Sequence, residues 1–231
     1  MPNDLWPLQR RSFFGRLAAG VAAFSGATAA PSTRRPSAST SWEPARHSQD
    51  DWFESLPGKH RYFFDTSSAN GAGEAITFAS NYFVANKGAY ALEPSDLAVV
   101  ICLRHWSTPF AYGDQIWAKY GAVFAERIKF NDPKTNAPPT VNVFNQDGYG
   151  MSLPNRGTTL DSMVAKGVHF AVCDMATHAY AGMVAGKMGL KADDVYGELK
   201  ASAIGNAHFV PAGIVAVNRA QERGYSFISM H

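Results

Sequence analysis

The chain has 231 residues, of which 46% are apolar and 17% charged, a balance that allows a sizeable buried core and excludes global disorder. Its 20 glycines and 13 prolines are too few for a fibrous or low-complexity protein, and its two cysteines are too few for a disulfide scaffold. No apolar run reaches the roughly 18 residues of a membrane-spanning helix. Since the 21 basic residues form no stripe with interleaved aromatic residues, nucleic-acid binding is not expected.

The first 29 residues have the pattern of an export signal. Arg10 and Arg11 precede two aromatic residues, a weakly apolar run begins at Leu17, and an A-x-A pattern ends at Ala29. Adjacent arginines with modest hydrophobicity are typical of twin-arginine (Tat) signals, so we expect the Tat translocase to export the chain, to the periplasm or otherwise out of the cytoplasm, with cleavage near Ala29. The alternative is a tail with a chance arginine pair. The segment holds three of the basic and one of the acidic residues, so the remainder is close to neutral.

The rest of the chain divides into a linker and one α/β domain. Residues 30–58 are expected to form a flexible linker, because the stretch from 31 to about 50 is rich in Ser, Pro and Ala. In residues 59–231, apolar runs alternate with amphipathic runs. This pattern predicts strands at 61–65, 97–103, 168–172, 207–210 and 225–228, and helices at 74–91, 112–128, 158–167, 177–188 and 211–223. The excursion over 129–157, rich in Pro, Asn and Gly, is a functional loop or an insertion. Strands alternating with helices predict a doubly wound parallel sheet with helices on both faces.

Two segments resemble the DsrE/DsrF-like sulfur-relay family. Residues 166–173 contain Gly-Val-x-Phe-x-Val-Cys, and residues 210–228 resemble the closing Val-Pro-(small)-Gly-Val…Gln-x-x-Gly-Tyr-x-(apolar)-Ile of that family. Residues 95–120 fit its second strand and following helix, and the resemblance spans about residues 60–229. It implies a flavodoxin-like three-layer α/β/α sandwich with a mainly parallel five-stranded sheet and a tendency to form homo-oligomers. In several members a cysteine carries persulfide sulfur.

The candidate catalytic residues are Cys173, Asp174 and His178. Cys173 comes where a strand ends and a helix is about to begin, at the carboxyl edge of the sheet, and a helix N-terminus favours a thiolate there. His178 lies about one helical turn beyond Asp174, so it could share or shuttle a proton, and as His⁺ it would favour the thiolate. Asp174 acts in the opposite direction, because a neighbouring carboxylate raises the pKa of a thiol. The alternative is a buried, inert cysteine.

Four further residues are candidates for ligand binding at the same edge. Arg104 and His105 follow the second strand and could hold an anion, while Asn70 and Gly71 offer backbone N–H groups at a helix start. The loops that carry these residues could converge on one pocket with Cys173. The glycines form no phosphate-binding fingerprint, so nucleotide binding is not expected.

The second cysteine, Cys102, lies within the apolar run 97–103 and is expected to be a core residue. In the flavodoxin-like strand order 2-1-3-4-5, the strands of Cys102 and Cys173 flank the first strand. Two inter-strand spacings of roughly 9–10 Å exceed the roughly 7 Å Cα separation that a disulfide allows. We therefore expect two free thiols, unless Cys173 bonds another chain.

The leading hypothesis is an exported protein that accepts, carries or binds sulfur species through Cys173. Its partners would be a sulfur-containing small molecule or a partner thiol protein. We expect the protein itself to have no cofactor, no metal and no membrane span in its mature form. The alternative is a non-catalytic binding or structural subunit of an oligomer or periplasmic complex, with an unreactive Cys173. A haem or redox carrier is a third possibility, but the sequence contains no H-x-x-x-H or C-x-x-C-H pattern to support it. A serine hydrolase is not expected, because the sequence contains no G-x-S-x-G motif.

Overall fold

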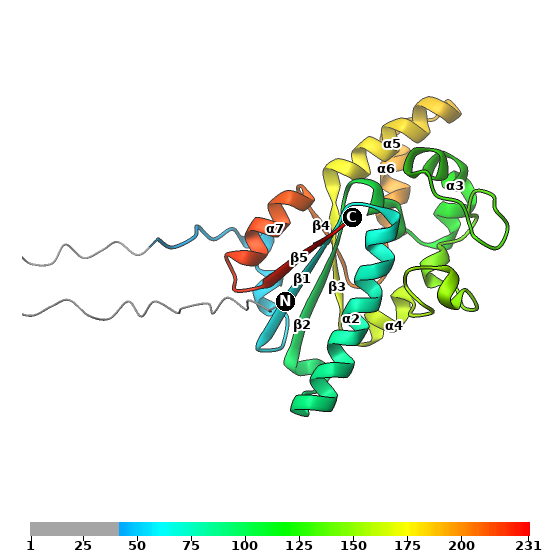
Figure 1. Ribbon diagram of the computed structural model, residues 1–231. Coiled ribbons are helices and arrows are strands. Elements are labelled where there is room, and N and C mark those ends of the chain that lie inside the picture. The colour runs from blue at the N-terminus through cyan, green and yellow to red at the C-terminus, as the bar shows by residue number, and fades with distance from the viewer. Residues whose placement is uncertain (1–41) are drawn as a thin grey trace, which may run out of the picture. The chain divides into compact units, whose positions relative to one another are not determined.

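A sheet of five parallel strands in the order β4-β3-β2-β1-β5 organises residues 44–231 (Figure 1). The computed structural model describes residues 42–231, so the expected signal segment with Arg10 and Arg11, and part of the expected linker, lie outside the described residues. The strands are β1 (His60–Thr66), β2 (Leu97–Leu103), β3 (His169–Cys173), β4 (Ala207–Val210) and β5 (Ser226–Met230). The helices are α1 (Trp52–Ser55), α2 (Ala69–Tyr90), α3 (Asp114–Ile128), α4 (Leu160–Ala165), α5 (Asp174–Met188), α6 (Ala192–Ala201) and α7 (Gly213–Gln221).

The central strand β2 shows why the apolar runs become sheet. All seven of its residues are apolar and all are buried, and it pairs in parallel with β1 on one side and β3 on the other. A strand covered on both faces needs a continuous apolar run, because both sets of alternating side chains enter a core. None of the helices within residues 42–231 has both the length and the apolar character needed to cross a membrane.

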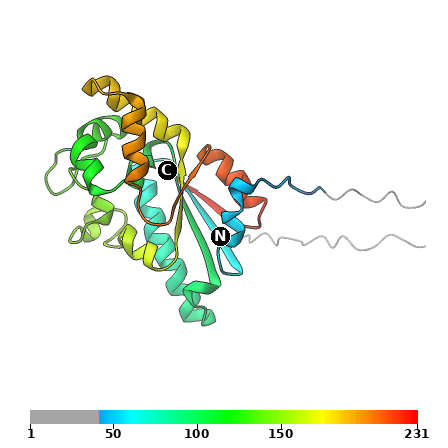
Figure 2. The same ribbon diagram turned by 180° about the vertical axis from the view of Figure 1, so that it is seen from behind.

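The two faces of the sheet are covered unequally. The chain advances in one direction from β1 to β4, and right-handed crossovers then place every connecting helix on the same face. Figures 1 and 2 show α2, α3, α4, α5 and α6 on one side of the sheet. Only the connection from β4 to β5 reverses direction, so α7 lies on the opposite side. We call the side covered by α7 the α7 face; it has its own, smaller apolar core.

The flavodoxin-like three-layer α/β/α class expected from the sequence is confirmed, but the strand order 2-1-3-4-5 is wrong. In the expected order the chain reverses direction early, so β2 and β3 flank β1. Here the reversal comes after β4, and β2 and β3 are hydrogen-bonded neighbours. The strands that carry Cys102 and Cys173 are therefore adjacent rather than two spacings apart.

The folded unit begins before residue 59. A short 3-10 helix (Ser48–Asp50) and α1 fall within the expected linker, yet Phe53 of α1 is completely buried against the α7 face. The backbone oxygen of Phe53 accepts hydrogen bonds from Arg61 Nη1 (2.7 Å) and the Tyr225 hydroxyl (2.7 Å). We call residues 44–56 the N-terminal strap. It covers part of the α7 face that the single helix α7 leaves open.

The excursion over residues 129–157 packs against the domain. Phe144 is fully buried in the larger core, and the Asn142 side chain donates hydrogen bonds to the backbone oxygens of Phe110 (2.8 Å) and Tyr112 (3.0 Å). The excursion is thus part of the layer that contains α2 and α3. Helix α6 was not predicted, and α2 begins five residues earlier than expected, with Ser68 as its N-cap.

Two histidines pair beneath the strap. His169 of β3 and His208 of β4 share a hydrogen bond between ring nitrogens (2.8 Å), and Trp52 stacks on His208 with 4.0 Å between ring centroids. Desolvation lowers the pKa of both imidazoles, and the neighbouring His169 lowers the pKa of His208 further, to about 4. Both rings are therefore neutral near pH 7, as one N–H donor and one acceptor.

Acidification is expected to destabilise the protein through this pair. Because the folded-state pKa of His208 lies below its unfolded value of 6.5, the unfolded chain takes up the proton first, and stability falls as pH drops from 6.5 to about 4. After allowance for solvent screening of the half-buried ring, the loss is about 1–2 kcal/mol. Urea unfolding of wild type and His208→Gln across this range measures it. His60→Gln, which changes an exposed histidine, should keep the wild-type pH dependence; if His208→Gln keeps it too, the pair is not its source.

Candidate functional site at the carboxyl edge

The strand order places a topological switch point at the carboxyl edge of the sheet, between β3 and β4. Adjacent strands β3 and β4 are followed by helices on opposite faces, α5 after β3 and α7 after β4. In open α/β sheets, ligands bind where neighbouring connections diverge in this way. Cys173 is the last residue of β3, pairs with Val210 at the end of β4, and serves as the N-cap of α5. The structure therefore puts the candidate thiol at the switch point of the sheet.

Register places one carboxylate and two thiols on the α7 face. Asp65 pairs with Cys102, and Cys102 pairs with Ala171, two residues before Cys173. Paired residues point to the same face and side chains alternate along a strand, so Asp65, Cys102 and Cys173 all point toward α7. A carboxylate and two thiols thus lie in neighbouring rows of one sheet face.

Arg104, expected to hold an anion, is paired with a carboxylate of the protein itself. Its Nε and Nη2 atoms donate to the two oxygens of Asp65 at 2.6 and 2.7 Å, and Ser229 donates a third hydrogen bond to Asp65 (3.1 Å). Asp65 is only 2% exposed. The hydrogen bond to Asp65 raises the pKa of Arg104, and both cysteines interact electrostatically with the guanidinium. The ion pair therefore places both a guanidinium and a carboxylate near the Cys102 thiol, where the carboxylate has the larger effect.

Gly213 makes room for this arginine. A Cβ atom at Gly213 would lie 2.5 Å from Cβ and Cδ of Arg104, which is closer than side-chain atoms approach. The Cys102 thiol lies 4.0 Å from the Gly213 backbone oxygen. The first residue of α7 therefore has to be small for Arg104 to reach Asp65.

Both cysteines are free, as predicted, although the geometry differs from the one expected. They are diagonal neighbours on adjacent strands, a separation of about 8 Å between Cα atoms, which is still longer than a disulfide allows. Cys102 is completely buried, and desolvation, followed by the Asp65 carboxylate, raises the pKa of its thiol well above the ordinary value. Cys173 is 7% exposed, and its backbone oxygen accepts a hydrogen bond from Thr177 (3.0 Å).

Asp174 and His178 are close to each other but belong to a network with α6. The His178 Nε2 and Asp174 Oδ2 atoms are 3.7 Å apart, and the exposed His178 ring stacks on Tyr196 with 3.9 Å between centroids. Tyr196 donates a hydrogen bond to Asp174 (2.8 Å), and Lys200 donates one to the Tyr196 hydroxyl (3.1 Å). Among the described residues, no hydrogen bond joins Asp174 or His178 to the Cys173 thiol. The pair instead fixes the first turn of α5 against α6.

His105 lies at the surface beside Arg104. Its backbone φ is +57°, a left-handed conformation that is uncommon outside glycine, and its ring stacks on Trp106 with 4.8 Å between centroids. Desolvation lowers the pKa of His105, and the positive charge of Arg104 adds to the decrease. His105 is therefore a neutral, exposed ring near pH 7.

Asn70 and Gly71 lie at the start of α2, on the opposite face from Arg104. The Gly71 N–H donates to the Ser68 hydroxyl (2.9 Å), which caps the helix, and Gly71 packs against the end of β5. Asn70 faces a cavity between α2 and the excursion. The ligand-binding candidates are thus divided between two faces and do not meet in one pocket.

Sequence reasoning missed the partners of these residues. Asp65 could have been recognised from the sequence, since a carboxylate that follows a buried apolar run needs a buried counter-charge. Tyr196 and Lys200 could also have been paired, because their four-residue spacing places them on one helix face. The role of Gly213 could not be predicted from the sequence, because it depends on where the Arg104 side chain passes in the folded structure. The described residues contain no group of three or more His, Cys, Asp and Glu side chains placed to hold a metal ion.

Replacement of Gly213 by Ala tests the arrangement around Arg104. The new methyl group is expected to displace Arg104 and leave the buried Asp65 carboxylate without its counter-charge, at a cost of about 3 kcal/mol in the free energy of unfolding. Chemical denaturation measures the change. Gly182→Ala is the matched control, because Gly182 lies on α5 with open space around its Cα, and that variant should be as stable as wild type or slightly more stable. Equal stability of the two variants would contradict the assignment.

Comparison of the chain with protein-family models, with curated proteins and with solved structures finds no match.

Proposed function

We propose that this protein is an exported carrier of sulfane sulfur, with Cys173 as the acceptor. One observation carries the proposal: Cys173 lies at the switch point between β3 and β4. The Arg104–Asp65 ion pair lies on the same face of the sheet as the Cys173 side chain. The sulfur-relay resemblance and the Tat-type segment support the same function and a periplasmic location. In this proposal the protein acts as a homo-oligomer with a partner thiol protein.

The proposed transfer moves one sulfur atom without net oxidation. The Cys173 thiolate attacks the outer sulfur of a persulfide donor, R–S–SH; the donor S–S bond breaks, a new S–S bond forms on Cys173, and the donor leaves as RS⁻. In the second half, the thiolate of a partner attacks the outer sulfur of the Cys173 persulfide and releases the Cys173 thiolate. Both halves exchange one S–S bond for another, so no external oxidant is needed.

The surrounding residues have distinct roles in this proposal. Arg104, held by Asp65, stabilises the anionic forms of Cys173 and its persulfide. Asp174 and His178 hold the first turn of α5, whose N-cap is Cys173. Cys102 takes no part, because burial keeps it protonated.

A second function is favoured by the burial of the candidate thiol. Cys173 is only 7% exposed, so a donor reaches it only if the neighbouring loops move aside. If they do not, the protein is a non-catalytic binding or structural subunit that uses the same fold, and its two cysteines are core residues.

Sulfur loading distinguishes the two functions. Intact mass spectrometry of the purified chain before and after polysulfide should show one or more added sulfur atoms in wild type and in Cys102→Ser. The additions should be lost in Cys173→Ser, because Cys173 is partly exposed at the carboxyl edge of the sheet whereas Cys102 is completely buried. Arg104→Gln should load several-fold more slowly, since it removes the positive charge near the thiol.

Sulfur loading has to be measured on both the folded and the urea-unfolded chain, because unfolding exposes both thiols. If the folded wild type gains no sulfur while the urea-unfolded chain does, Cys173 is a core thiol and the carrier proposal fails in favour of the structural subunit. Sulfur that remains in Cys173→Ser and disappears in Cys102→Ser would also overturn it, because the reactive thiol would then be the fully buried one.

A further inference from the structure

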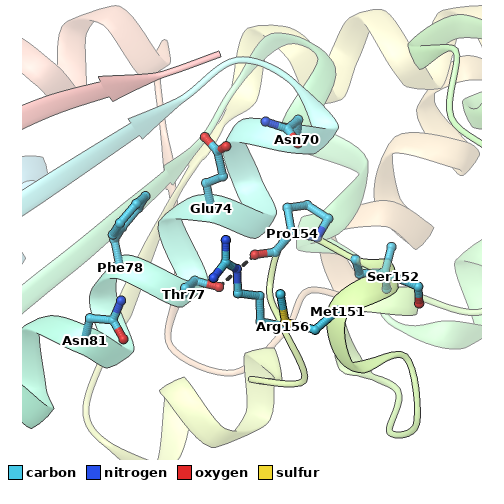
Figure 3. Close-up of a pocket in the computed structure, with 10 residues that line it drawn as sticks. Asn70, Glu74, Thr77, Phe78, Asn81, Met151, Ser152, Pro154 and Arg156 are labelled. Carbon is cyan, nitrogen blue, oxygen red and sulfur yellow. Dashed lines mark hydrogen bonds between the residues drawn. The ribbon is translucent and has the colours of Figure 1, made fainter.

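A cavity of about 350 Å³ lies between α2 and the excursion, on the face of the sheet opposite α7 (Figure 3). One wall is a stripe of α2, and the other wall is the segment 151–156. Figure 3 shows Glu74, Phe78 and Asn81 projecting from α2, with Arg156 extending toward them from the excursion. The volume is at the lower end of the range for small-molecule sites, which suits a ligand of about ten heavy atoms. The cavity includes none of the proposed sulfur-transfer residues.

The two walls are fixed to each other. The Thr77 hydroxyl donates a hydrogen bond to the Pro154 backbone oxygen (2.7 Å), and this interaction is drawn in Figure 3. Gly73, one turn earlier on α2, has no side chain, and any Cβ there would overlap the Pro154 ring. The Ser152 hydroxyl donates to the Tyr149 backbone oxygen. The cavity is therefore formed in the absence of a ligand, so binding does not have to order its walls.

Arg156 is held in an unusual backbone conformation at the cavity. Its φ is +49°, in the left-handed region, and Gly157 follows with φ +82°. A non-glycine residue there costs about 1–2 kcal/mol, and such strain concentrates at ligand sites. The backbone N–H of Arg156 donates to the Leu153 oxygen (3.0 Å), which closes the turn. The turn directs the arginine side chain toward α2.

The two charged side chains that line the cavity, Glu74 and Arg156, have no side-chain partners within residues 42–231. Among residues 42–231, neither Glu74 nor Arg156 makes an ion pair or a side-chain hydrogen bond, even with each other. The side-chain amides of Asn70 and Asn81 are equally without partners in that range. Beside them lies an apolar surface, since Phe78 is 48% exposed and Met151 is 75% exposed. A carboxylate, a guanidinium, two amides and an apolar surface thus face one space.

We propose that this cavity binds a free α-amino acid with an apolar side chain. The guanidinium of Arg156 binds the ligand carboxylate through paired hydrogen bonds, and Glu74 binds the ammonium group. The apolar side chain of the ligand packs on Phe78 and Met151. A dianionic ligand such as a phosphate ester is disfavoured, because Glu74 would repel it. The opposite charges on two walls therefore select a zwitterion.

Calorimetry with the purified full chain tests the proposal, with L-leucine, L-methionine and L-phenylalanine as probes. At least one should bind with a Kd of about 1 mM or tighter, and Arg156→Gln and Glu74→Gln should each weaken binding at least tenfold. Matched ligands assign the two contacts. L-leucine amide lacks the carboxylate and N-acetyl-L-leucine lacks the ammonium group, so both should bind weakly to wild type. Arg156→Gln should lose the preference for leucine over its amide, and Glu74→Gln the preference for leucine over its N-acetyl form.

Control variants separate the cavity from general charge effects. Lys191→Gln and Asp193→Asn remove exposed charges at the start of α6, and both should bind the amino acids as wild type does. Binding that is equal in Arg156→Gln, Glu74→Gln and wild type overturns the proposal, as does the absence of binding by all three amino acids. Sulfur loading of Cys173 should be unchanged in Glu74→Gln, so failure of this proposal and failure of the carrier function are distinguishable.

Discussion

The handedness of the crossovers is the constraint on which the rest of this structure depends. Because the chain advances without reversal from β1 to β4, its connecting helices accumulate on one face, and only α7 remains for the other. The same reversal after β4 makes α5 and α7 diverge beside Cys173. The position of the candidate thiol and the need for an N-terminal strap are therefore two results of one topological event.

The buried ion pair shows how the α7 face accommodates charge. Asp65 follows the apolar residues 62–64 of β1 and is nearly inaccessible to water, so it needs both the bidentate contact with Arg104 and the hydrogen bond from Ser229. Arg104 reaches it only because Gly213 opens α7 without a side chain. Three segments far apart in the sequence thereby define the position of a single guanidinium. That guanidinium also acts on the thiol of Cys102, two residues earlier in the chain, against the larger raising effects of burial and Asp65.

Much of this architecture is predictable from the sequence because it follows local patterns. The apolar run 97–103 becomes β2 with the same bounds, since a continuous apolar segment of this length is buried on both faces of a sheet, and residues 207–210 become β4 as predicted. The strand order is not local, so the analogy with flavodoxin-like order failed. The same limit applies to the site. Cys173 was placed at a strand end by its neighbours in sequence, whereas its relation to Arg104, Asp65 and Gly213 depends on register across three strands.

The free energy needed to open the structure differs between the strap and the sheet. Residues 44–56 contribute Phe53 and Leu56 to the smaller core, but their hydrogen bonds to the rest of the domain come from a few side chains such as Arg61 and Tyr225. Detachment of this segment breaks far fewer interactions than separation of the strands, so its free energy is a fraction of the global value. The strap is therefore a local opening unit. We expect it to detach and dock again many times for each complete unfolding of the sheet.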